Sequence, residues 1–61
     1  MKHIDTNPPA EGTPILVSDG QHKEVAYFCD GNLYYLEYDP HLGVLRKQVL
    51  HGNYNLWTEI L

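Results

Sequence analysis

The stretch that decides the fold runs from residue 23 to residue 38 and reads Lys-Glu-Val-Ala-Tyr-Phe-Cys, then Asp-Gly-Asn, then Leu-Tyr-Tyr-Leu-Glu-Tyr. Two runs rich in aromatic and apolar residues flank an Asp-Gly pair, which is the strongest short-range signal for a β-hairpin. The sequence therefore predicts two antiparallel strands joined by a tight turn at Asp30 and Gly31.

Short strands are also predicted on both sides of this hairpin, over residues 13–18, 44–51 and 54–61. Turn-forming residues separate the strands at intervals of roughly ten residues, a spacing typical of an antiparallel meander. We expect an all-β fold of four to five short strands, SH3-like or a similar small barrel, over residues 13–61. Residues 1–12 contain Asn-Pro-Pro and are expected to form a flexible or extended arm, because proline cannot continue a helix or a central strand.

Length and cysteine content limit how the chain can be stabilised. A chain of 61 residues makes one domain, and its single cysteine, Cys29, excludes an intramolecular disulfide. The N-terminus lacks the apolar core of a signal peptide, and no apolar run approaches the ~18 residues of a membrane-spanning helix. A cytoplasmic protein with a reduced thiol is the expectation.

The charge balance is acidic, with eight Asp and Glu against four Lys and Arg, which gives a formal net charge of −4. A nucleic-acid partner requires a cluster of cations that neutralises phosphates, and the sequence has none. We therefore expect neither a nucleic acid nor a membrane as partner. An acidic surface suits solubility, or a protein partner of opposite charge.

Aromatic side chains are the most prominent candidates for binding. Period-two alternation places apolar residues on both faces of the central hairpin, whereas a solvated antiparallel sheet usually has one polar face. Either the chain covers both faces, or one aromatic face is kept for a partner; both possibilities remain open. The candidate partner-binding residues are Tyr34, Tyr35, Glu37, Tyr38, Tyr54 and Trp57.

Residues that could carry catalysis or bind a metal show no recognised spacing. The four histidines and Cys29 lack the close pairs typical of zinc ligands. Asp19, Asp30 and Asp39 each precede glycine or proline. Aspartate in such a position stabilises a turn, because its side chain forms hydrogen bonds with the nearby backbone. The sequence predicts no catalytic residue, no metal and no cofactor.

Part of the chain resembles a family of short phage and prophage proteins of unknown function. The shared features are Pro-Ala-Glu-Gly at residues 9–12, Ile-Leu-Val at 15–17, Val-Ala-Tyr-Phe at 25–28, the Asp-Gly hairpin and the closing Trp57. The resemblance implies a small β fold and a phage origin. Leu56 stands where the family usually places a histidine before the closing tryptophan, and no proline follows here.

These observations lead to a ranked set of functional hypotheses. The first is a non-enzymatic protein-binding module, phage-encoded, that binds and inhibits a host protein. The alternatives are a structural homo-oligomer, such as a homodimer, whose aromatic face is the subunit interface, and a small metal-binding protein. Unpaired strand edges that could accept a partner strand favour the first hypothesis.

Overall fold

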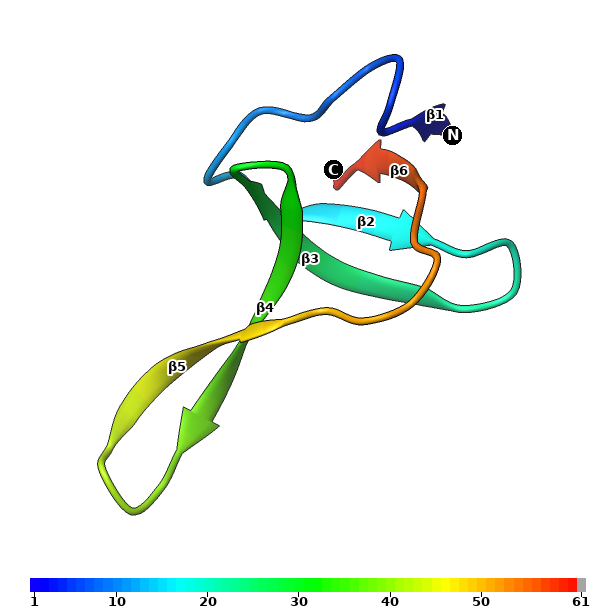
Figure 1. The fold of residues 1–61 in the computed structure, drawn as a ribbon. Coiled ribbons are helices and arrows are strands. Elements are labelled where there is room, and N and C mark those ends of the chain that lie inside the picture. Colours follow the sequence, from blue (N-terminus) through cyan, green and yellow to red (C-terminus); the bar gives the residue numbers. More distant parts are fainter. Residues whose placement is uncertain (61) are drawn as a thin grey trace.

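Residues 1–60 are described by the computed structural model, and they form one antiparallel sheet of six strands. In chain order the strands are β1 (Lys2–His3), β2 (Ile15–Ser18), β3 (Lys23–Cys29), β4 (Asn32–Asp39), β5 (Val44–Val49) and β6 (Leu56–Glu59). Their order in the sheet is β1-β6-β2-β3-β4-β5 (Figure 1). The predicted all-β class is confirmed, and β2 to β5 form a meander within a small, barrel-like domain.

The central turn has the backbone conformation that its sequence predicts. Asp30 and Gly31 both have positive φ, at 52° and 80°, and Cys29 lies opposite Asn32 across the hairpin. Positive φ at both central residues is required by the two-residue turn whose twist matches that of the flanking strands. Local chemistry thus sets the register of β3 against β4.

The last strand pairs at the far edge of the meander instead of beside β5. After Val49 the chain returns past β3, and β6 inserts between β1 and β2, with Trp57 opposite both Lys2 and Val17. The strand expected over residues 54–61 is shorter than predicted, because Asn55 N donates to Asn53 O (2.9 Å) in a tight turn ahead of it. Leu61 lies outside the described residues.

A small core lies where β2, β3 and β6 run side by side. Its buried side chains are Ile15, Val17, Ala26 and Trp57, and the half-buried side chains around it are Ile4, Leu33, Leu50 and Tyr54. The register explains this cluster: paired residues on antiparallel strands point to the same side of the sheet, and Ile15 lies opposite Ala26 while Val17 lies opposite Trp57.

The N-terminal segment, predicted as a flexible or extended arm, follows the rim of this core. Its β1 pairs with β6, Ile4 N donates to Asn55 O (3.0 Å), and Gly12 N donates to Phe28 O (3.4 Å). The Trp57 Nε1–H group donates to Asn7 O at 2.7 Å. The arm is therefore tied to the sheet near both of its ends and at its middle.

The β4–β5 hairpin projects away from the core, which gives the molecule its length of 39 Å against 23 and 22 Å in the other directions (Figure 1). Strands β3 and β4 pair only through Tyr27 and Tyr34, Phe28 and Leu33, and Cys29 and Asn32. Beyond Tyr34 strand β4 continues beside β5 and leaves β3. The sheet consequently splits between β3 and β4.

Candidate functional site

One face of the β3–β4–β5 region points away from the core. Tyr27, Tyr34 and Val49 lie opposite one another across the three strands, and so share one side of the sheet. Ala26, which is buried in the core, points to the other side. Alternation then assigns the members of what we call the outer face: Lys23, Val25, Tyr27 and Cys29 on β3, Asn32, Tyr34, Leu36 and Tyr38 on β4, and Leu45, Lys47 and Val49 on β5.

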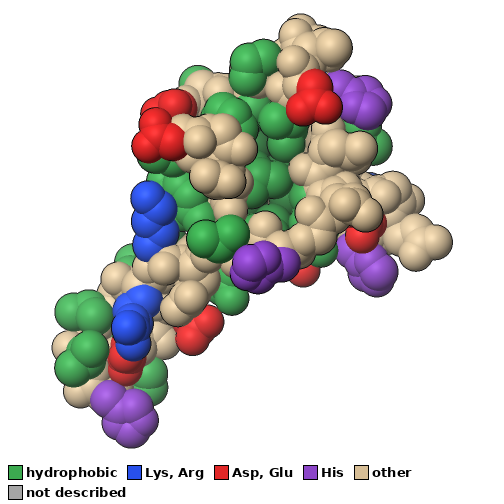
Figure 2. Space-filling view, viewed as in Figure 1, with side chains coloured by type: hydrophobic (Ala, Val, Ile, Leu, Met, Phe, Trp, Pro, Cys, Tyr) green, Lys and Arg blue, Asp and Glu red, His purple; other side chains and the backbone are tan. Residues whose placement is uncertain are grey.

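Most apolar side chains of the outer face are exposed to solvent. The exposed fractions are 53% for Val25, 44% for Leu36, 61% for Tyr38, 64% for Leu45 and 56% for Val49. Together they present on the order of 400 Å² of apolar surface, a size at which patches on monomeric proteins are often functional. Hydrophobic side chains also lie at the surface of the projecting hairpin in Figure 2, next to Lys and Arg side chains.

The charges on the outer face have one sign although the chain is acidic. Lys23 and Lys47 are its charged members, and the eight carboxylates of the chain all lie elsewhere. Glu24, Glu37, Asp39 and Glu59 alternate onto the opposite side, and the remaining carboxylates belong to the arm and the turns. An acidic protein thus keeps one apolar face that carries only positive charge.

Tyr34 is the centre of an ordered group on this face. Its ring stacks on that of Tyr27, with centroids 5.7 Å apart and planes inclined by 19°. The Lys47 ammonium lies 4.2 Å from the centre of the Tyr34 ring, within the range of a cation–π interaction. These contacts hold Tyr34 half-buried in its own chain.

The six residues predicted from the sequence are distributed over three places. Tyr34 and Tyr38 belong to the outer face, whereas Tyr35 and Glu37 alternate to the opposite side of β4. Tyr54 is half-buried in the loop before β6, and Trp57 is a core residue only 6% exposed. Trp57 therefore offers a partner almost no surface in this structure.

The other large side chains of the outer face were not among the predicted residues, namely Lys23, Val25, Tyr27, Leu36, Leu45, Lys47 and Val49. The signal for Leu36 was its period-two position between Tyr34 and Tyr38. For the β5 residues no local signal exists, because their side of the sheet depends on the register with β4. Pairing across the second hairpin supplies that information.

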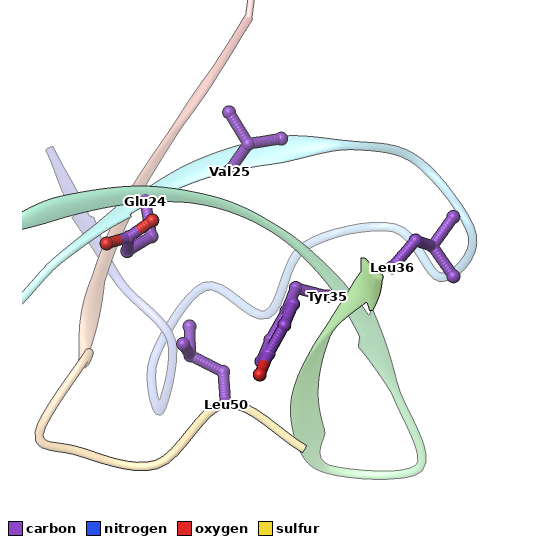
Figure 3. A pocket seen from close by; sticks show the side chains of 5 residues that line it. All are labelled: Glu24, Val25, Tyr35, Leu36 and Leu50. Atoms are coloured by element: carbon purple, nitrogen blue, oxygen red, sulfur yellow. The ribbon is translucent and has the colours of Figure 1, made fainter. Parts of the chain in front are cut away.

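A cleft occupies the opposite side of the split between β3 and β4. It has a volume of about 560 Å³ and is lined by Glu24, Val25, Tyr35, Leu36 and Leu50. Figure 3 shows Glu24, Tyr35 and Leu50 converging on the cleft, while the Val25 and Leu36 side chains point away from it. Among residues 1–60 the Glu24 carboxylate has no ion-pair partner.

The pKa of the Tyr54 hydroxyl is affected by two acidic groups of this region, Asp19 and Glu24. Burial raises the pKa of Tyr54, and the negative charges of Asp19 and Glu24 raise it further. Two carboxylates, those of Asp19 and Glu24, thus act on the Tyr54 hydroxyl.

The turn aspartates have the structural roles that their positions suggest. The Asp19 carboxylate accepts from the backbone N–H groups of His22 (2.6 Å) and Gln21 (2.9 Å). These two bonds, together with a side-chain bond to the His22 ring, lower the pKa of Asp19 to about 2. Asp39 accepts from His41 N at 2.9 Å and from Arg46 Nη1 at 3.2 Å. Arg46 thus pairs with Asp39, although Glu37 is its register partner.

One group of possible metal ligands occurs in the described part of the chain. Donor atoms of Glu11, Cys29 and Asp30 lie within 4.8 Å of one another beside the central turn. A structural zinc site takes four ligands, usually cysteine and histidine, and none of the histidines joins this group. Asp30 N donates to Glu11 Oε2 at 3.4 Å, so the carboxylate is already engaged in holding the arm to the turn.

Comparison of the chain with protein-family models, curated proteins and solved structures gives no match. Over residues 1–60 no helix is long and apolar enough to cross a membrane.

Proposed function

We propose that the chain is a non-enzymatic protein-binding module whose outer face docks on a partner protein and modulates it. The observation that carries this proposal is the exposed apolar surface of the outer face. No carboxylate belongs to that face, although the chain has a net charge of −4. Keeping such a surface in water is unfavourable, and burial against a partner recovers about 25 cal/mol per Å² of apolar area.

The charges on the outer face define the chemistry of the partner. Lys23 and Lys47 flank the apolar residues, so a complementary surface is apolar at its centre and acidic at its rim. Opposite charges at the rim of an interface mainly accelerate association and reject wrong partners. The resemblance of residues 9–35 to short phage proteins favours a bacterial host protein in the cytoplasm as the target and inhibition as the effect.

A homo-oligomer formed through the same face is the second candidate. A two-fold symmetric contact places the same patch of both copies together, which brings four lysines into one interface without a carboxylate from either outer face. That arrangement is electrostatically unfavourable, so we rank self-association below a partner of different sequence. Sedimentation at concentrations from micromolar to millimolar distinguishes the two: a stable dimer would favour the second candidate.

The experiment for the first candidate compares wild type with Leu45→Glu in capture from bacterial lysate. Leu45 is 64% exposed, so the substitution changes the outer face without opening the core. We expect one stoichiometric protein with wild type and its loss with Leu45→Glu. His41→Glu, an exposed change in the hairpin loop, is the matched control and should retain it. Equal capture by all three proteins would refute the proposal.

A further inference from the structure

The split between β3 and β4 leaves one strand edge on each side without hydrogen bonds, because the two strands diverge beyond Tyr27 and Tyr34 (Figure 1). The register that pairs Tyr27 with Tyr34 would next pair Val25 with Leu36 and then Lys23 with Tyr38, but among residues 1–60 neither pair forms. Each edge is instead free on the side of the split. The fold therefore contains a gap between two diverging strands, each with an unpaired edge.

Backbone direction identifies the groups that point into the gap. In a strand the N–H and C=O groups of one residue point to the same neighbour, and successive residues alternate. Phe28 O accepts from Gly12 N, so the backbone groups of Phe28 point to the arm side of β3. Val25 lies three residues before Phe28, so its backbone N–H and C=O groups point the other way, toward β4. Leu33 O accepts from Leu50 N on the β5 side of β4, so the backbone N–H and C=O groups of Leu36, three residues further on, point toward β3.

The same alternation directs Lys23 on β3 and Tyr38 on β4 into the gap. Each of the four residues brings one donor and one acceptor that this part of the chain does not use. A row of such groups is a template for pairing with another strand.

The cleft behind the gap supplies a pocket for one side chain of such a strand. The Glu24 carboxylate, the Tyr35 ring and Leu50 converge there, and Glu24 has no cation partner among the described residues. A lysine or arginine suits this lining, because its methylene stem can lie on Leu50 and Tyr35 while its charged end meets Glu24. A neutral or acidic side chain would leave the Glu24 charge unpaired.

We infer that the split accepts an extended segment of the partner protein as an added β-strand. The inserted segment carries lysine or arginine on the side that faces Glu24, and apolar residues with an acidic neighbour on the side of the outer face, near Lys47. The inference rests on the proposed function and states which element of the partner is bound. Main-chain bonds to Leu36 and Tyr38 provide affinity, and the two sides of the strand provide specificity.

The test begins with selection from a displayed library of random eight-residue peptides. The selected consensus, made as a fluorescent peptide, is then titrated with wild type, Glu24→Gln and Glu59→Gln. Glu59 is an exposed carboxylate of β6 that does not line the cleft, so its variant controls for the loss of one charge. We expect a basic residue in the consensus, a roughly tenfold weaker affinity for Glu24→Gln, and an unchanged affinity for Glu59→Gln.

Amide hydrogen exchange of the wild-type complex provides a measurement that depends on no variant. Binding of the consensus peptide should slow exchange at Leu36 and Tyr38, whose N–H groups point into the split. A consensus without a basic residue, equal affinity of the two variants, or unchanged exchange at both amides would overturn the inference, as would a selection that enriches no peptide.

The proposed function fails on a different result. If Leu45→Glu abolishes capture of the partner while no peptide occupies the split, binding occurs through the outer face alone. If Leu45→Glu captures the partner as wild type does, the proposed function itself is wrong.

Discussion

Replacement of Trp57 by phenylalanine tests whether this residue holds the fold together or serves an interface. Trp57 is 6% exposed, packs among Ile15, Val17 and Ala26, and donates from Nε1 to Asn7 O at 2.7 Å. Phenylalanine removes that bond, worth about 1 kcal/mol, and leaves space where the second ring of the indole was. We expect the free energy of unfolding to fall by about 2 kcal/mol.

A loss of that size is large for this chain, because a domain of its length is stabilised by roughly 3–9 kcal/mol in total. For a domain this small each kcal/mol shifts the melting temperature by about 4–8 °C, so Trp57→Phe should melt about 10 °C lower. Urea and thermal unfolding followed by circular dichroism measure both quantities. Amide exchange at Ile4 should also accelerate, because the arm loses the bond that holds its middle to the core.

The matched control is Tyr38→Phe, which changes an aromatic side chain that is 61% exposed. Exposed substitutions of this kind usually change stability by less than about 0.5 kcal/mol. If Trp57→Phe is as stable as Tyr38→Phe, then Trp57 does not support the core and the structural account of the arm is wrong.

Three further predictions concern the split, the turn before β3 and the central hairpin. In the unbound protein the amides of Leu36 and Tyr38 should exchange faster than the amide of Glu37, because only the Glu37 N–H group points toward β5 and is bonded there. Equal protection of all three amides, measured by NMR, would mean that β3 and β4 pair further than described. The pKa of Asp19 is lowered from 3.8 to about 2, so its carboxylate stabilises the fold above pH 4 and loses this effect as the pH falls toward 2. Melting of wild type and Asp19→Asn should therefore converge over that range, and a constant difference would contradict the assignment. Gly31→Ala places a side chain at a φ of 80° and should lower the free energy of unfolding by about 1 kcal/mol in urea titrations, unless the turn has another conformation.

Local signals were sufficient to predict the central part of the fold. The Asp-Gly turn and the alternating aromatic runs on either side of it specify β3 and β4 without information from the rest of the chain. The pairing of β6 with β1 and β2 could not be predicted in this way, because it joins residues about forty positions or more apart. No property of residues 56–59 distinguishes the edge beside β5 from the edge beside β2.

The sequence predicted that the candidate site would be an aromatic surface, but it did not predict on which side of the sheet that surface lies. Alternation separates Tyr34 and Tyr38 from Tyr35, but it does not reveal which side of the sheet meets the core. That choice depends on Trp57, which β6 carries onto the side of Val17, so that the side of Val25 remains exposed. The aromatic surplus is consequently divided between core and surface, a result that composition alone could not give.

Hydrogen–deuterium exchange on the complex with the captured protein tests the central claim most directly, because it shows which strands the partner covers. Docking on the outer face predicts slower exchange over β4 and β5 and little change in β1 and β6. Protection confined to the arm, β1 and β6, with β4 and β5 exchanging as in the unbound protein, would contradict the assignment of the outer face as the binding surface.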